Sequence, residues 1–450
     1  MVKKILITDH YPLNKGIVAV LIAIINSLKR FVPNAEFTVL SYSPEVTPRF
    51  NKVKILPPLI KLEPSEGLPK LINMLRLFYI IIVSTTWAIL QKVSCAFANF
   101  IIKGLNIEKK EILQEYAKSS LILSAGGILD PACGMSGLGI LTQFYSAFIA
   151  KLLGKPFMIY AYSVLPFKHL SWKRFFFKLV SLVSWNKADL ITLRDDLSRR
   201  ALQDLGVTKP ATYVTADPAL LLDSEKQERV NEILFQEGVV STEGRPLIGM
   251  TPVDLERGTH QSGVQWAHYH YPFSLNPYAE HKKYEKALAQ IADYLIEKLN
   301  AIIIFVPMNF KGHPSDDRPI ACRIIEKMKH KESVKIIVNE YTAEEQKGIF
   351  GQMDLLIGTR MHSLILATPM LVPVIGIAYE NKVEAFMERT GQKKWVCDLY
   401  GINAEDLINK INELWHTRDE IRRNLKPKIK ALQECALLNA KLAAELLKSH

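Results

Sequence analysis

An arginine and a histidine stand two residues apart directly after a short apolar run, in the segment MDLLIGTRMHSLILATPMLVPVIGIAYENK at 353–382. Arg360 can hold a phosphate or carboxylate group with two parallel hydrogen bonds, which a lysine cannot do equivalently. His362 titrates near neutral pH and could donate or accept a proton. Either residue alone would more often be a surface ion pair or an ordinary buried histidine. Their joint position after a predicted strand at 355–357 favours a site for a small anion, with proton transfer at the same place.

A second arginine also follows a predicted strand. The strand at 190–193 ends at Arg194, and the aspartate pair at 195–196 then caps a helix. The simpler interpretation is that Arg194 pairs with one of these aspartates. Another strand ends at Gly126 and Gly127, which would let a ligand approach the backbone closely, although many α/β turns contain two glycines.

An aromatic stretch, WAHYHY at 266–271, follows the first strand of the second half. Aromatic faces stack on sugar rings, so we interpret Trp266 and His268 as lining for a saccharide, with plain packing as the alternative. A His-x-His pair is too little for a metal site. The cysteines, at 95, 133, 322, 397 and 435, form no CxxC pair. The sequence therefore predicts no metal site, and a reduced, cytoplasmic chain.

Strands and helices alternate through the first half of the chain, which is typical of a parallel, doubly wound sheet. The expected strands lie at 5–8, 36–41, 120–124, 157–162, 190–193 and 212–214, with a helix at 17–31. A mostly polar stretch at 223–245 is expected to be a linker. The pattern then restarts, with strands at 247–250, 301–306, 334–338, 355–357 and 372–377, a long helix at 284–298 and a charged helical segment at 404–447.

The length of 450 residues is too great for one core, since single cores stop growing near about 250–300 residues. We therefore expect an α/β protein with two Rossmann-like domains facing a cleft. The N-terminal domain would span 1–225, the C-terminal domain with the anion site 245–400, and a C-terminal helical segment 401–450.

An apolar helical insert is expected at 66–107. Its stretch 77–102 carries only one charge, Lys92, and the 14 residues before Gln91 are shorter than the about 20 that a membrane span needs. A crossing would also separate the strand at 5–8 from its sheet. The remaining alternatives are a buried helix pair and a helix lying in a membrane interface, and we favour the interface.

A second unusual stretch, 166–188, is rich in basic and aromatic residues and has no acidic residue. It could lie on an anionic bilayer, or it could pack its aromatic side chains on the sheet with solvated lysines outside. The formal net charge of +12 likewise favours a negatively charged partner. No RNA- or DNA-binding module is recognisable, so nucleic acid is not expected as a partner.

Several of these motifs, taken in order, resemble the polysaccharide pyruvyl transferase family. They are NxG near the start, SAGGxLD, ADLITLRDDLS, a DP after a strand, and GTRMHSLILA followed by AYENKV. The most specific are TRMHSLI with its downstream YxxK, and LRD. The similarity covers residues 5–20, 120–220 and 340–400.

The resemblance implies a two-domain fold similar to that of GT-B glycosyltransferases. It also implies transfer of a pyruvyl group from phosphoenolpyruvate to a saccharide as a cyclic ketal, with no cofactor besides that co-substrate. By the same resemblance Arg194 and Arg360 hold the phosphate and carboxylate of the donor. Lys382 helps to bind the donor, and His362 acts in acid/base catalysis. Tyr379 precedes Lys382 and could reach the same place.

The first loop departs from the family pattern. Many members have NxGDE, whereas this chain has NKGIV at 14–18, so both acidic residues are missing. If such an acid orients the acceptor, another carboxylate must replace it, and Asp9, Asp130 and Glu380 are candidates by their positions after strands. We assign Asn14 and Asp130 to acceptor binding, together with the aromatic stretch.

The leading hypothesis is thus a pyruvyl transferase acting on a saccharide in cell-surface glycan synthesis, with a lipid-linked precursor at the inner face of a membrane as a candidate acceptor. One alternative is a GT-B-type glycosyltransferase that uses a nucleotide sugar. Another is a catalytically degenerate member that binds saccharide. The missing first-loop acids favour this last hypothesis, whereas the retained arginines and histidine oppose it.

Overall fold

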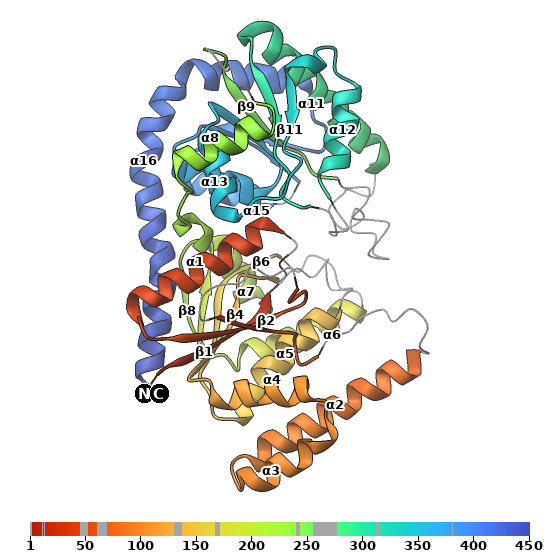
Figure 1. The fold of residues 1–450 in the computed structure, drawn as a ribbon, viewed down its shortest axis with the longest axis vertical. Coiled ribbons are helices and arrows are strands. Elements are labelled where there is room, and N and C mark those ends of the chain that lie inside the picture. Colours follow the sequence, from red (N-terminus) through yellow and green to blue (C-terminus); the bar gives the residue numbers. More distant parts are fainter. Residues whose placement is uncertain are drawn as a thin grey trace. The chain divides into compact units, whose positions relative to one another are not determined.

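The computed structural model forms two compact units (Figure 1). Unit 1 comprises Met1–Pro12, Ile24–Ala216 and Leu437–His450, and unit 2 comprises Leu13–Ala23 and Asp217–Ala436. The predicted domains follow one another along the chain, whereas each unit combines segments that are far apart in sequence. The structure describes residues 2–10, 12, 14–45, 53–60, 70–129, 137–166, 172–239, 244–254, 277–310, 316–379 and 381–450.

Unit 1 is built on a parallel sheet. In sheet order its strands are β3 (Val53–Leu56), β2 (Glu36–Ser41), β1 (Lys4–His10), β4 (Leu121–Ala125), β6 (Phe157–Val164), β7 (Leu190–Leu193) and β8 (Ala211–Val214), and the short β5 (Ile128–Leu129) pairs with β6. The order reverses between β1 and β4, where Thr8 is in register with Ser124. Ligands of open α/β sheets bind beside the carboxyl ends of the strands at such a reversal.

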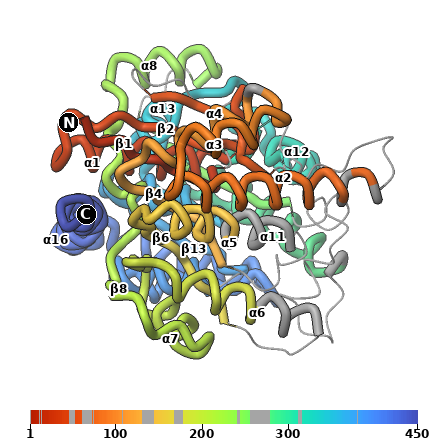
Figure 2. The backbone as a smooth tube through the Cα atoms, turned by 90° about the horizontal axis from the view of Figure 1, so that it is seen from below, coloured from red at the N-terminus to blue at the C-terminus, as the bar shows by residue number. Residues whose placement is uncertain are grey.

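The helices of unit 1 include the two segments singled out in the sequence. They are α1 (Lys15–Phe31, whose first turns belong to unit 2), α2 (Lys70–Leu90), α3 (Cys95–Ile101), η1 (Ile102–Gly104), α4 (Ile107–Lys118), α5 (Gly137–Leu152), α6 (Trp172–Trp185) and α7 (Asp196–Leu205). α2, α3 and η1 form the predicted apolar insert. α2 and α3 lie side by side (Figures 1 and 2).

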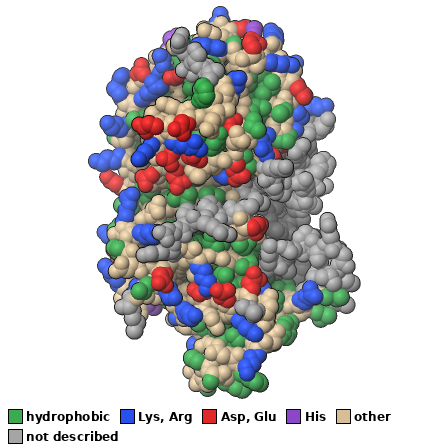
Figure 3. All heavy atoms as spheres, in the orientation of Figure 1, with side chains coloured by type: hydrophobic (Ala, Val, Ile, Leu, Met, Phe, Trp, Pro, Cys, Tyr) green, Lys and Arg blue, Asp and Glu red, His purple; other side chains and the backbone are tan. Residues whose placement is uncertain are grey.

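The insert is partly buried and partly exposed. Trp87 and Ala98 are fully buried, whereas many other apolar side chains of α2 and α3 face outward, as Figure 3 shows at the lower end of the molecule. Among the described residues, no helix combines the length and the apolar character needed to cross a bilayer.

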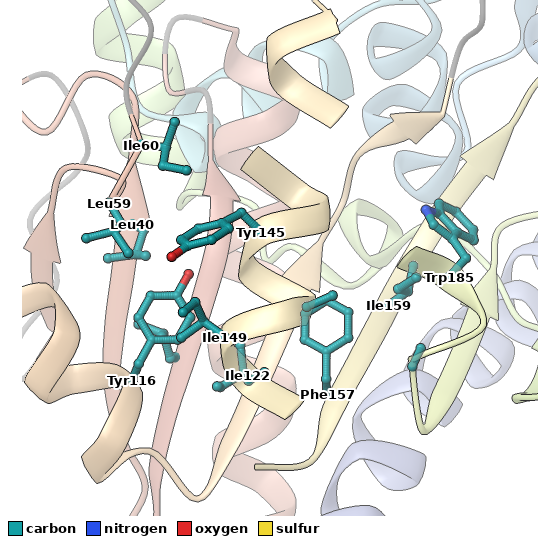
Figure 4. Packing of buried hydrophobic residues seen from close by; sticks show 14 of the residues in the cluster. Leu40, Leu59, Ile60, Tyr116, Ile122, Tyr145, Ile149, Phe157, Ile159 and Trp185 are labelled. Atoms are coloured by element: carbon teal, nitrogen blue, oxygen red, sulfur yellow. The ribbon is translucent and has the colours of Figure 1, made fainter. Parts of the chain in front are cut away.

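The aromatic helix α6 also contributes to the core. Trp185 is fully buried (Figure 4). Its ring meets that of Tyr162 edge-on, with 5.5 Å between ring centroids. The interpretation that 166–188 packs its aromatic side chains on the sheet is therefore correct for Trp185. The aromatic side chains at 172–177 lie outside the described ones, so the membrane interpretation of that part of the helix stays a prediction.

Unit 2 has a second parallel sheet. Its order is β11 (Val334–Ile336), β10 (Ile302–Phe305), β9 (Leu247–Thr251), β12 (Leu355–Gly358), β13 (Val374–Ala378) and β14 (Val396–Asp398). The order reverses between β9 and β12, and both strands are buried along their whole length. Such apolar strands are typical of parallel sheets covered on both faces.

The helices of unit 2 surround this sheet. They are η2 (Pro218–Leu221), α8 (Gln227–Gln236), α11 (Pro277–Leu299), α12 (Arg318–Glu326), η3 (Lys331–Ser333), α13 (Ala343–Gly351), α14 (Met361–Ala367), η4 (Thr368–Met370), α15 (Asn381–Arg389) and η5 (Lys393–Trp395). The last helix, α16 (Ala404–Lys448), belongs to unit 2 up to Ala436 and to unit 1 beyond it.

The polar stretch at 223–245 was predicted to be a linker. This prediction was wrong, because the stretch contains α8. The helix buries Val230, Ile233 and Leu234, which lie on one face at helical spacing. Val230 packs against Gly348 of α13, where a Cβ atom would approach it to 2.4 Å. A helix of ten residues that buries only three apolar side chains is mostly polar, so its composition resembles that of a linker. The two parallel α/β sheets and the C-terminal helix are confirmed.

Candidate functional site

Polar side chains gather at the strand-order reversal of unit 2. The buried hydroxyl groups of Thr251, at the end of β9, and Ser363, on α14, lie 2.7 Å apart. Thr359, directly after β12, shares a 2.7 Å hydrogen bond with the hydroxyl of Tyr284, which accepts the backbone N–H of Val253 at 3.3 Å. These bonds join the carboxyl ends of β9 and β12 and hold the backbone around residue 360 in one place.

Arg360 is held by a buried carboxylate. Its Nη2 donates to Oδ1 of Asp317, whose Oδ2 accepts the backbone N–H groups of Met308 and Asn309 at 3.0 Å each. Burial by itself would lower the pKa of Arg360, but the adjacent Asp317 carboxylate outweighs burial and raises it. A guanidinium has five N–H donors, and the hydrogen bond to Asp317 uses one of them.

His362 is packed against the first turn of α1. A Cβ atom placed on Gly16 would lie 2.1 Å from Cγ of His362, so only glycine allows this approach. The Nε2 atom of His362 lies 3.9 Å from Oδ2 of Asp217. Asp217 is itself fixed, because its Oδ1 accepts the N–H of Ala219 at 2.9 Å and so caps η2. An imidazolium at position 362 would therefore form an ion pair with a buried carboxylate.

Asn14 ties the beginning of α1 to the sheet of unit 2. Its Oδ1 accepts the N–H groups of Gly16 and Ile17 at 2.9 and 3.2 Å, and its Nδ2 donates to Oδ1 of Asn309 at 2.6 Å. The amide thus caps the helix and connects it with the loop after β10. Asn14 places Gly16 beside His362, and its predicted role in acceptor binding stays a prediction.

An aromatic residue and a lysine follow β13, the strand next to β12. Tyr379 follows β13 and lies near enough to Arg360 to contribute to the raised pKa of the guanidinium. The ammonium group of Lys382, on α15, lies 5.6 Å from the centroid of the Tyr379 ring, at the distance of a cation–π contact. The structure therefore brings Arg360, His362, Tyr379 and Lys382 into one unit, at neighbouring strand ends.

Arg194, in unit 1, braces the backbone at two positions, one in β6 and one after β4. The buried guanidinium donates from Nε to the carbonyl of Ala161 at 2.7 Å and from Nη2 to the carbonyl of Gly126 at 2.8 Å. Gly126 and Ala161 both have positive φ, of 71° and 51°. Gly127 lies against the ring of Tyr162, where a Cβ atom would approach to 2.5 Å. Arg194 and Arg360 belong to different units, so a donor site that uses both stays a prediction.

The strand-order reversal of unit 1 carries a carboxylate. Asp9, the penultimate residue of β1, has φ of 69°, and its Oδ2 accepts hydrogen bonds from the hydroxyl groups of Thr8 and Ser124 at 2.7 and 2.8 Å. Burial raises the pKa of Asp9 above the usual value, and the two hydrogen bonds only partly oppose this. Positive φ at a non-glycine residue costs backbone strain and is more common at functional sites.

Asp9 lines a small cavity together with Tyr116, Tyr145 and Ser146. Figure 4 shows the hydroxyl groups of the two tyrosines pointing toward one another. The next residue, His10, is buried, and burial lowers its pKa to about 3. His10 is therefore neutral at pH 7, and Asp9 is the titratable group of this strand end with a position suited to proton transfer.

Other predicted site residues fall outside the described part of the chain. They are Asp130, Trp266, His268 and Glu380. Among the described residues, no group of three or more His, Cys, Asp or Glu side chains is arranged to hold a metal ion.

Two residues that hold the site were not recognised in the sequence. Asp217 was visible as part of a DP turn after a strand, but nothing indicated that it faces His362. Asp317 belongs to DDRP at 316–319, and an acidic residue before proline is a common helix-start signal. That signal does not indicate a pairing with Arg360.

Arg194→Lys is expected to destabilise the protein in the absence of any ligand. A lysine cannot reach both carbonyls, and a buried carbonyl left without a donor costs about 1–3 kcal/mol of unfolding free energy. Chemical denaturation of the variant measures this loss. The control is Arg199→Lys, an exposed arginine that pairs with Asp196 at 2.7 Å. Equal stability of both variants would show that Arg194 has no bracing role.

The sequence of this chain is similar to those of known proteins. A family model for polysaccharide pyruvyl transferase matches residues 14–381. The amylovoran biosynthesis protein AmsJ of Erwinia amylovora is 22% identical over 454 residues, which cover 99% of this chain and 99% of AmsJ.

Solved structures share the architecture. Anabaena Alr3699/HepE in complex with UDP-glucose has a TM-score of 0.57 at 14% identity, over 99% of this chain and 100% of HepE. Sucrose-phosphate synthase of Thermosynechococcus elongatus has a TM-score of 0.57 at 12% identity over 100% of both chains. The UDP-GlcNAc 2-epimerase of Neisseria meningitidis bound to UDP-GlcNAc has a TM-score of 0.56 at 11% identity, over 99% of this chain and 100% of the epimerase. At such low sequence identity the structural similarity shows the fold alone. It confirms the prediction of a GT-B-like fold.

The family match contains the residues on which the resemblance in the sequence rests. Asn14, Arg194, Arg360 and His362 all lie inside it, and it ends one residue before Lys382. It extends over most of both units, so the recognition made from the motifs is confirmed. The chain belongs to the polysaccharide pyruvyl transferase family.

Proposed function

We propose that this protein transfers a pyruvyl group from phosphoenolpyruvate to a saccharide, forming a ketal during synthesis of a cell-surface polysaccharide. The family match and the similarity to an amylovoran biosynthesis protein support a transferase in polysaccharide synthesis. The observation that carries the donor assignment is a charged arginine, held by Asp317, two residues from a histidine that faces Asp217. A lipid-linked acceptor at the inner face of a membrane is part of the proposal.

The donor suits these side chains. Phosphoenolpyruvate carries a phosphate and a carboxylate in a small volume, and planar guanidinium groups bind both kinds of anion with two hydrogen bonds. In this proposal Arg360 binds one of these groups, and Lys382 adds a positive charge near it. Arg194 remains a donor-binding candidate by resemblance only, since its guanidinium also braces the backbone of unit 1.

The reaction needs one proton donor and one proton acceptor. The imidazolium of His362 protonates the methylene carbon of phosphoenolpyruvate, and an acceptor hydroxyl forms a bond to the adjacent carbon while its proton passes to a carboxylate. A second hydroxyl of the saccharide then attacks the same carbon, passes its proton to the now neutral His362, and breaks the bond between that carbon and the phosphate oxygen. Inorganic phosphate leaves, and the two new C–O bonds close the ketal. Asp217 stabilises the charged histidine before the first step.

Asp9 is our candidate for the carboxylate that replaces the missing first-loop acids. It lies near the end of β1 at the strand-order reversal of unit 1, has positive φ, and has a raised pKa. A carboxylate with a raised pKa is a better proton acceptor, which suits a general base. Its hydrogen bonds from Thr8 and Ser124 fix its orientation.

A nucleotide-sugar glycosyltransferase is the second candidate, because proteins with this fold include sugar-nucleotide enzymes. Such an enzyme would need an acidic residue that contacts the ribose. Glu285, on α11, is a buried acidic residue of unit 2, but it is bound by Arg323 at 2.6 Å and Lys327 at 2.8 Å. Burial alone would raise the pKa of Glu285, and the hydrogen bonds from His281 and these cations lower it to about 2. This internal pairing disfavours the second candidate.

The donor assignment is tested by the thermal stability of the protein with phosphoenolpyruvate and, separately, with a panel of nucleotide sugars. A ligand that binds only the folded state stabilises it by about 2.7 kcal/mol at a hundred times its dissociation constant. We expect this effect for phosphoenolpyruvate, and a loss of about tenfold or more in affinity for Arg360→Lys, because the bidentate contact is lost.

Two controls make this result specific. Arg422→Lys changes an arginine on α16 that pairs with Asp419 at 3.1 Å, and it should bind donor normally. Unfolding of each variant without ligand separates a folding defect from a binding defect. Unchanged donor affinity in Arg360→Lys would contradict the assignment, and stabilisation by a nucleotide sugar alone would favour the glycosyltransferase.

His362 is expected to act on the bound donor and not to bind it. His362→Gln should keep donor affinity and lose turnover. Gly16→Ala should displace the imidazole and lower turnover ~100-fold, as misplacement by about 1 Å can do. The control is Gly351→Ala, since a Cβ atom there meets only Met370, whose flexible methyl end can move aside. Phosphate release measures turnover, and normal turnover of His362→Gln would exclude this proton donor.

Asp9→Asn is expected to lose activity without losing stability. Because burial raises the pKa of Asp9 above 3.8, its folded form holds a proton more tightly than its unfolded form. Its contribution to stability therefore falls as the pH rises through the folded-state pKa, and the ionised group costs stability at pH 7. Asparagine removes this charge and tolerates positive φ.

Thermal unfolding and phosphate release of Asp9→Asn at pH 7 check this expectation together. An unfolding temperature equal to or above that of the unchanged protein, with strongly reduced turnover, would fit a catalytic carboxylate. A large loss of stability with normal turnover of the remaining folded protein would show that Asp9 has a structural role instead.

A further inference from the structure

Exposed apolar side chains are concentrated on one helical pair. Of the 17 large apolar residues that are exposed in the described chain, nine lie between positions 72 and 100. We call these nine the apolar face: Ile72, Leu75, Phe78, Tyr79, Ile82, Ile89, Val93, Phe97 and Phe100. Leu75, Phe78, Tyr79 and Ile82 follow the spacing i, i+3, i+4, i+7, which places them on one side of α2.

The apolar face is distinct from the face that anchors these helices in unit 1. Trp87, Ala88 and Ala98 are fully buried in the core of the unit. Ser84 lies on the buried side too, with its hydroxyl 2.5 Å from that of Tyr145 on α5. α2 is therefore attached to the unit on one side, while Ile82 is 63% exposed and Phe100 61% exposed on the other.

The charges around the apolar face have one sign. Residues 71–107 contain no aspartate or glutamate, and their charged residues, Arg76, Lys92 and Lys103, are all exposed. The ammonium group of Lys103 lies 4.9 Å from the centroid of the Phe100 ring. Aromatic and aliphatic residues combined with lysine and arginine are typical of helices that lie in the headgroup region of an anionic bilayer.

We propose that the apolar face of α2 and α3 docks this protein on the surface of an anionic membrane, parallel to the bilayer and without crossing it. The apolar side chains enter the boundary between headgroups and acyl chains, and Arg76, Lys92 and Lys103 contact lipid phosphates. Figure 3 shows green apolar atoms and blue basic atoms together over this end of the molecule.

A second copy of the chain fits this face less well. Symmetric dimers bury the same patch of both subunits against each other, and this patch has no acidic residue between 71 and 107 that could pair with its three basic ones. An anionic bilayer instead attracts these residues. The attraction contributes about 1 kcal/mol of binding free energy for each lysine or arginine near the bilayer surface.

Flotation of the full-length protein with phosphatidylcholine vesicles, with and without phosphatidylglycerol, tests the proposal. We expect the protein to float with the anionic vesicles, less at high salt, and weakly with neutral ones. The double variant Phe97→Ser/Phe100→Ser and the charge-reversal variant Lys92→Glu/Lys103→Glu should each bind anionic vesicles about tenfold or more weakly.

The matched control is Phe235→Ser, because Phe235 on α8 is 70% exposed and lies on unit 2. This variant should float like the unchanged protein. Equal flotation of all variants, or none with anionic vesicles, would overturn the proposal. Light scattering of the same proteins would also overturn it by showing a dimer that the Phe97→Ser/Phe100→Ser variant loses. Thermal stabilisation by phosphoenolpyruvate should be the same in every variant, so failure of vesicle binding is distinguishable from failure of the donor assignment.

Discussion

The ion pair between Arg360 and Asp317 is the interaction on which the site of unit 2 depends. A buried charge is costly unless it is paired and hydrogen-bonded. Asp317 meets this requirement with two backbone N–H groups at 3.0 Å as well as the guanidinium. The pair joins the start of α12, the loop after β10 and the end of β12. Arg360 is thereby charged and fixed before any ligand binds, so little conformational entropy is lost when an anion arrives.

The position of His362 depends on a segment from the other end of the chain. The first turns of α1 belong to unit 2, and Asn14 fixes them by bonding Asn309. Gly16 then allows the imidazole to lie against the helix backbone. Glycine is thus required at this position of the family motif because His362 approaches it closely. This requirement is independent of the missing acidic residues. Departure from NxGDE removes two carboxylates but leaves the packing of His362 intact.

The two sheets use the same topology for different chemistry. Each reverses its strand order once, and polar residues follow the strands at both reversals. In unit 2 the residues are an ion pair and a histidine, which suit an anionic donor. In unit 1 the carboxylate of Asp9 accepts hydrogen bonds from the buried hydroxyl groups of Thr8 and Ser124. The apolar face of α2 and α3 adds a third surface, whose basic character fits the net charge of +12.

Much of this protein was determined by local sequence. The alternation of apolar runs predicted nearly all strands of both sheets, since a buried parallel strand is apolar along its length. The motifs at 194 and 360–362 could be placed at strand ends for the same reason. Short or polar elements were missed, among them β3, β5, β14 and α8. The partners of the site were decided only by tertiary structure, because Arg360 and Asp317 are separated by 43 residues and Asn14 and Asn309 by 295. Contacts over such distances follow from which strands become neighbours, and no local pattern encodes that choice.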